Sequence, residues 1–104
     1  MSRSTQQKFF EALEAIAEKH GVEVINDRQW ANTGTVRIER ATEFTPLVRF
    51  YYGFQDTYAY FEGLQPPFGL PHLNGKAHPM VKPEELEKRI LTPIAQILDG
   101  TWKR

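Results

Sequence analysis

The residues best suited to metal binding or catalysis are two histidines, His72 and His78, in the proline-rich stretch 64–82. Imidazole rings bind transition metals and exchange protons near neutral pH, so this pair would suit a metal site or acid–base catalysis. A metal would need a third ligand, for which Glu62 and Asp56 are the candidates. Two histidines at this spacing in a loop are a weak metal motif, so we favour hydrogen bonds from these rings to the backbone.

The sequence excludes several catalytic chemistries. The chain has no cysteine, which excludes thiol nucleophiles and cysteine-ligated metals. Its only serines, Ser2 and Ser4, lie at a predicted helix cap rather than in a pocket. The phosphate-loop patterns GxxxxGK[ST] and GxGxxG and the zinc pattern HExxH are all missing. We therefore expect a protein that is not an enzyme and that holds neither cofactor nor metal.

Residues 44–63, around which the rest of the chain is organised, are predicted to contain a β-hairpin. Residues 48–54 and 58–61 are rich in aromatic and β-branched side chains, and Gln55-Asp56 is the predicted centre of the turn between them. Side chains alternate between the two faces of a strand. One face of the hairpin would then belong to the core, with Val48, Phe50, Tyr52, Phe54, Ala59 and Phe61.

The other face of this hairpin is the first candidate for function. It carries Arg49, Tyr51, Tyr58, Tyr60 and Glu62. With the turn centred on Gln55-Asp56, Tyr51 faces Tyr60 and Arg49 faces Glu62. Cross-strand pairs of this kind contribute roughly 0.2–1 kcal/mol each.

Three interpretations of this tyrosine-rich face remain open. It can be an ordinary solvent-facing surface, because tyrosine has a good strand propensity. It can be a protein contact, a homodimer seam or the site of a different partner, because tyrosine and arginine are enriched among interface anchors. It can be a platform on which single-stranded nucleic acid stacks, with Arg49 and Lys76 near phosphates. Thirteen basic and 13 acidic residues cancel, so nucleic acid is the less favoured partner.

The segments before the hairpin predict one helix and two strands. Ser4 and Gln7 have the spacing of a capping box, and Gly21 is a stop signal, so a helix is predicted over residues 5–20. Residues 22–26 and 35–41 are predicted strands. Between them, residues 27–34 form a predicted polar connection, and we expect its Trp30 to fold back onto the edge of the core.

The last part of the chain predicts a helix that proline interrupts. Pro83 suits a first helical turn, whereas Pro93 removes a backbone hydrogen bond and predicts either a kink or two short helices with Thr92 as the cap of the second. Gly100 is the predicted end.

Residues 64–82 hold four of the chain's seven prolines and are predicted to be irregular. Long irregular segments of compact domains are often functional. This stretch is therefore the second functional candidate, with Phe68, His72 and His78.

These patterns predict a single α+β domain over residues 1–104, with the element order αββββα. Its four-stranded antiparallel meander would carry the N-terminal helix and the proline-kinked C-terminal helix on one face. The sequence contains no apolar run that could span a membrane and no signal-peptide pattern, so we expect a cytoplasmic protein.

We expect the function of a small protein-binding module: an adaptor, inhibitor or accessory factor of a larger complex. In size it also matches the small inhibitors of phages and plasmids. The alternative is a module that binds single-stranded nucleic acid through the same tyrosine-rich face.

Overall fold

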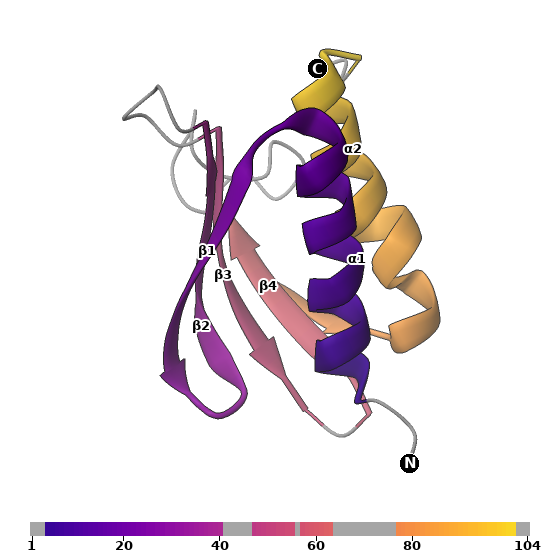
Figure 1. The fold of residues 1–104 in the computed structure, drawn as a ribbon. Coiled ribbons are helices and arrows are strands. Elements are labelled where there is room, and N and C mark those ends of the chain that lie inside the picture. The colour runs from indigo at the N-terminus through magenta and orange to yellow at the C-terminus, as the bar shows by residue number, and fades with distance from the viewer. Residues whose placement is uncertain (1–3, 41–46, 56, 64–76, 102–104) are drawn as a thin grey trace.

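One antiparallel sheet with helices on one of its faces makes up the fold (Figure 1). The computed structural model describes residues 4–40, 47–55, 57–63 and 77–101, with the backbone alone at 77–80. The predicted α+β class, the antiparallel meander and the helices on one face are confirmed. Among the described residues, no helix has the length and apolar character needed to cross a membrane.

Helix α1 covers Thr5–His20, as the sequence predicts. The Ser4 hydroxyl accepts a hydrogen bond from the backbone N–H of Gln7, and the Gln7 side chain accepts one from the backbone N–H of Ser4. These two bonds satisfy amides that a helix start leaves without partners. Gly21 ends the helix in the left-handed conformation, at φ 67°, which a residue without a β-carbon adopts readily.

Within the described residues the sheet has five strands in the order β1-β2-β3-β4-β5, and each pairs with the next in antiparallel fashion. The strands are β1 Glu23–Trp30, β2 Thr33–Glu39, β3 Val48–Phe54, β4 Ala59–Gly63 and β5 Ala77–Val81.

The polar connection predicted over residues 27–34 is wrong, because β1 and β2 continue through most of it. Arg28 pairs with Gly34, and Trp30 pairs with Thr33 after a bulge. Pairing with β2 therefore outweighs the low strand propensity of the polar residues. The expected position of Trp30 is also wrong: its side chain is 75% exposed and lies at the tip of this hairpin.

A fifth strand, β5, forms at the end of the stretch that was predicted to be irregular. In the ladder, His78 lies opposite Phe61 and Val81 opposite Ala59, with an irregularity between them. Proline lacks an N–H for a ladder and is tolerated at edge strands and bulges. Pro79 occupies such a place, since β5 is an edge of the sheet and its register shifts at this point.

The faces of the aromatic hairpin are as predicted, but its register differs by two residues. Phe54 pairs with Ala59, Gly53 with Tyr60 and Tyr51 with Glu62. The backbone N–H of Gln55 donates to the Tyr58 carbonyl, so the turn is centred one residue later than predicted. A shift of two residues leaves every side chain on its own face.

Pro93 bends the C-terminal helical segment without breaking it. The segment begins with the 3-10 turn η1, Pro83–Glu85, continues as the π-helical turn η2, Glu87–Leu91, and ends as α2, Thr92–Asp99. The Thr92 N–H donates to the Glu87 carbonyl, five residues back, which widens the helix immediately before the proline. The predicted cap at Thr92 is wrong, because no side chain caps the start of α2.

The core lies between the helices and the inner face of the sheet. Phe9 of α1 packs at its centre, with ring centroids 5.4 Å from Phe61, 5.6 Å from Phe54 and 6.4 Å from Phe50. All six hairpin residues assigned to the core by alternation are buried. The buried residues of the C-terminal segment face this core: Leu86, Ile90, Leu91, Pro93, Ile94 and Leu98.

Candidate functional site

The outer face of β3 and β4 carries five of the predicted site residues. We call Arg49, Tyr51, Tyr58, Tyr60 and Glu62 the tyrosine face. The three tyrosines are half-buried, whereas Arg49 and Glu62 are exposed. Both helical segments lie on the opposite side of the sheet (Figure 1). The described helices therefore leave the tyrosine face open.

Two of these tyrosines form one packed unit. The rings of Tyr51 and Tyr60 have centroids 5.8 Å apart, and the Tyr60 hydroxyl donates to the Tyr51 hydroxyl at 3.4 Å. The Tyr60 ring also lies directly against Gly53, its partner in the ladder. Because these contacts restrict both rings, little side-chain entropy remains to be lost when another molecule binds.

The surroundings of Tyr60 also shift the pKa of its phenol group. The hydrogen bond with Tyr51 raises the pKa of Tyr60 above its ordinary value, and burial and the charges of Tyr51, Glu62 and Tyr58 act in the same direction. The Tyr60 hydroxyl therefore stays protonated at neutral pH and can donate a hydrogen bond.

On this side of the sheet, basic residues come from two neighbouring strands, β2 and β3. Arg49 lies opposite Arg37 of β2, and the predicted Arg49–Glu62 pair is replaced by a Tyr51–Glu62 pair. Arg37 is engaged with a carboxylate, since its Nε lies 3.5 Å from Asp27 Oδ2. This contact is electrostatic only, because that Nε is buried without a hydrogen-bond partner. Arg49 is the exposed member of the pair.

The predicted partner contacts of the proline-rich stretch, Phe68, His72 and His78, remain a prediction. Phe68 and His72 lie outside the described residues, and for His78 only the backbone position in β5 is described. No group of three or more metal-ligating side chains occurs in the described part of the chain.

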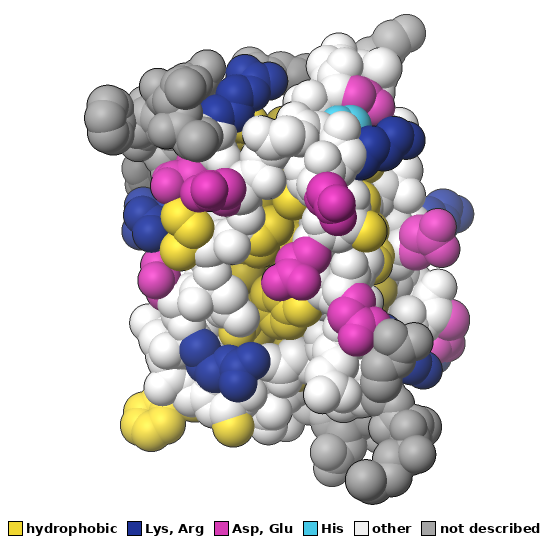
Figure 2. Space-filling model, in the orientation of Figure 1, with side chains coloured by type: hydrophobic (Ala, Val, Ile, Leu, Met, Phe, Trp, Pro, Cys, Tyr) yellow, Lys and Arg dark blue, Asp and Glu magenta, His cyan; other side chains and the backbone are white. Residues whose placement is uncertain are grey.

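A hollow lies between α1 and β1 (Figure 2). The sequence patterns do not predict it. It consists of two adjoining cavities of about 450 and 430 Å³ that share Glu14 and Val24 in their linings. Its walls come from α1 and β1, and the sequence does not give the distance between these two elements. The missed signal is the row Glu11, Glu14 and Glu18, at helical spacing on one side of the buried stripe of α1.

Comparison of the chain with protein-family models, with curated proteins and with solved structures gives no match.

Proposed function

We propose that this chain is a small non-enzymatic module that binds a protein partner through the tyrosine face. The observation that supports it is the packed Tyr51–Tyr60 unit on the side of the sheet that the described helices leave open. Aromatic rings that are already ordered present a large contact area at a low entropic cost. With exposed Arg49 at its side, this unit has the composition of an interface hot spot.

The partner is a different protein, to which the module would act as an adaptor, inhibitor or accessory factor, or a second copy of the chain. The charges of the face favour a partner of mixed polarity, because Arg49 and Glu62 are both exposed on it. Phe68, His72 and His78 stay in the proposal as additional contacts from the proline-rich stretch.

Single-stranded nucleic acid is the second candidate ligand. The observation in its favour is the pair Arg37–Arg49 on adjacent strands, close to Tyr51, because bases stack on aromatic rings while arginines contact phosphates. Two carboxylates weaken this candidate: Asp27 lies near Arg37, and Glu62 is opposite Tyr51.

The test is affinity capture from the native lysate, with and without nuclease, using the wild type and the double variant Arg49→Glu/Tyr58→Ala. Tyr58 is chosen because Tyr60 packs against Gly53, so replacing Tyr60 would disturb the sheet. The control is Lys88→Glu, an exposed charge on the helical side. The proposal predicts a protein partner that survives nuclease, is lost with the double variant and is kept with the control. Partners that disappear with nuclease would favour nucleic acid instead.

A further inference from the structure

The two edges of the sheet differ in how well they are protected. Unpaired strand edges invite another strand, and proteins often block them with proline or bulges. Strand β5 carries Pro79 within its span. Strand β1 has eight residues without proline and, among the described strands, pairs only with β2. Its bulge lies at the far end, between Arg28 and Trp30, so the part that begins at Glu23 is regular.

The backbone groups that β1 offers at this edge follow from the ladder. The Phe54 N–H donates to the Asn32 carbonyl, so even-numbered residues of β2 point toward β3 and odd-numbered ones toward β1. In agreement, the Asp27 carbonyl lies against Gly34 of β2, 2.8 Å from where a β-carbon would be. The N–H and C=O groups of Val24 and Asn26 therefore point away from the sheet.

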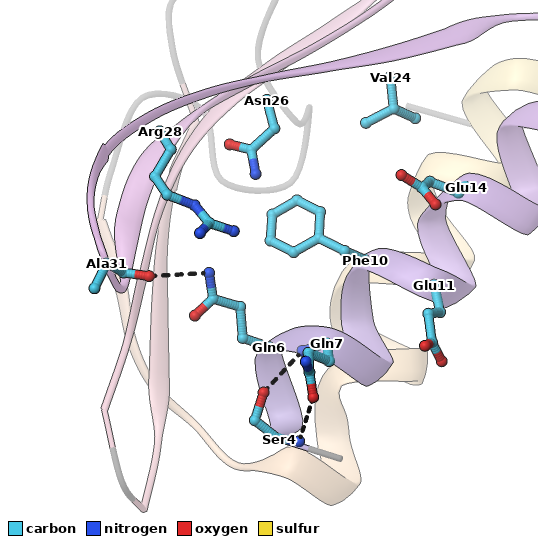
Figure 3. A pocket seen from close by; sticks show the side chains of 10 residues that line it. All are labelled: Ser4, Gln6, Gln7, Phe10, Glu11, Glu14, Val24, Asn26, Arg28 and Ala31. Carbon is cyan, nitrogen blue, oxygen red and sulfur yellow. Dashed lines mark hydrogen bonds between the residues drawn. The ribbon is translucent and has the colours of Figure 1, made fainter.

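The side chains of these same residues line the hollow between α1 and β1, which we call the edge groove. Val24, Asn26 and Arg28 extend from β1 toward Phe10 of α1 (Figure 3). An added strand would place every second side chain on this side, about 7 Å apart. Two such side chains would enter the two cavities that meet at Glu14 and Val24.

The two cavities differ in charge. The cavity nearer the start of β1 is lined by the apolar side chains of Ala17, Val22 and Val24, and the exposed Glu14 and Glu18 of α1 border it. No basic residue is among its described lining. Glu14 and Glu18 are one helical turn apart and repel each other. An apolar hollow with a carboxylate rim fits the aliphatic stem and charged head of lysine or arginine.

The other cavity favours a different side chain. Phe10 and Val24 supply apolar surface, and Glu11 and Glu14 lie on its helix side. Arg28 stands at the end away from the glutamate-rimmed cavity. Figure 2 shows apolar side chains in the hollow and acidic side chains around it. Along β1, the side chain that the groove would prefer in a bound segment thus changes from basic, through apolar, to acidic.

We propose that the edge groove binds an extended segment of a partner protein, which adds to β1 as a sixth strand. A lysine or arginine of this segment occupies the cavity of Glu14 and Glu18. An aliphatic or aromatic residue two positions away packs on Phe10, and an acidic residue two positions further lies near Arg28. Main-chain hydrogen bonds to Val24 and Asn26 supply affinity, and the cavities supply specificity. This surface is independent of the tyrosine face.

The test begins with selection from a phage-displayed library of random nonapeptides on the immobilised full chain. The expected consensus has a basic, an apolar and an acidic residue at alternate positions. A synthetic copy of the selected peptide is then titrated by fluorescence polarisation. For the Glu14→Lys/Glu18→Lys variant we expect an affinity at least about tenfold lower, since two opposite charges become like charges. The control Glu84→Lys/Glu87→Lys makes the same charge change on exposed residues of the C-terminal segment and should alter affinity less than about twofold.

Amide hydrogen exchange provides a readout that needs no variant. The Val24 and Asn26 amides should exchange quickly in the free chain and slowly with the peptide, while the amides of Ile25 and Asp27 stay slow throughout. The double variant Arg49→Glu/Tyr58→Ala should bind the peptide as the wild type does, which separates this surface from the tyrosine face.

Three outcomes would overturn the proposal. The first is a library that yields no binder. The second is a consensus that lacks the basic residue, or a selected peptide whose affinity is the same for the wild type and for Glu14→Lys/Glu18→Lys. The third is a dimer in analytical ultracentrifugation in which the Val24 and Asn26 amides are already protected, because a second copy would then occupy the edge.

Discussion

The ring of Tyr60 covers Gly53 on the tyrosine face of the sheet. The two residues are directly opposed in the ladder between β3 and β4, and a β-carbon at position 53 would lie 2.4 Å from Cε1 of the ring. The glycine thus makes room for the aromatic ring, and the ring in turn shields the backbone of Gly53 from solvent. Gly53 is buried as a result.

The first prediction concerns this contact. Gly53→Ala should lower the free energy of unfolding by about 1–3 kcal/mol, because the added methyl group forces the Tyr60 ring out of its place. Urea denaturation measures the change. In a Tyr60→Ala background the same substitution should cost less than about 0.5 kcal/mol, since the obstacle is gone. Equal costs in both backgrounds would show that the ring does not rest on the glycine.

The second prediction concerns pH. Folding raises the pKa of Tyr60, chiefly through the hydrogen bond with Tyr51, so the folded chain holds this proton more tightly than the unfolded chain does. The resulting stabilisation is present at neutral pH and is lost as the pH rises through the raised pKa, above the ordinary value of about 10. Tyr51→Phe should lower the pKa of Tyr60, as measured by tyrosinate absorbance with Tyr60→Phe as the reference. An unchanged pKa would mean that the two hydroxyls do not interact in solution.

The features that the sequence predicts well depend on periodicity. The capping box at Ser4, the stop at Gly21 and the apolar spacing between them define α1 without reference to the rest of the fold. Alternation likewise assigns each residue of β3 and β4 to its face. The composition of the tyrosine face therefore follows from the sequence alone.

Features that depend on contacts between distant segments are harder to predict from the sequence. The hairpin register is wrong by two residues because such a shift preserves both faces, and only the turn geometry distinguishes the alternatives. The second half of β1 is polar and becomes a strand only through pairing with β2. The edge groove needs the distance between α1 and β1, and no local pattern contains it.

The third prediction concerns Trp30, at the tip of the β1–β2 hairpin. Because 75% of this residue is exposed, Trp30→Ser should change the free energy of unfolding by less than about 0.5 kcal/mol. In a Trp102→Phe background, which leaves Trp30 as the only tryptophan, iodide should quench its fluorescence readily. Weak quenching or a large loss of stability would place the ring against the protein instead.

The fourth prediction concerns the hydrogen bond that links β3 to β1 across β2. The ring of Tyr52 is fully buried, and its hydroxyl donates to Asn26 Oδ1 at 2.9 Å while lying over Gly34. Tyr52→Phe leaves an exposed amide oxygen that water can reach, so it should cost about 0.5–1.5 kcal/mol. Asn26→Ala leaves a buried hydroxyl without its acceptor and should cost about 1–3 kcal/mol.

The order of these two costs is the informative result. Urea denaturation of both single variants and of the double variant gives the coupling energy between the two side chains. With the double variant, the cost should fall below the sum of the single costs, because a phenyl ring needs no acceptor. If Asn26→Ala proves nearly neutral, water from the edge groove has replaced the amide, and the Tyr52 hydroxyl is accessible from that groove.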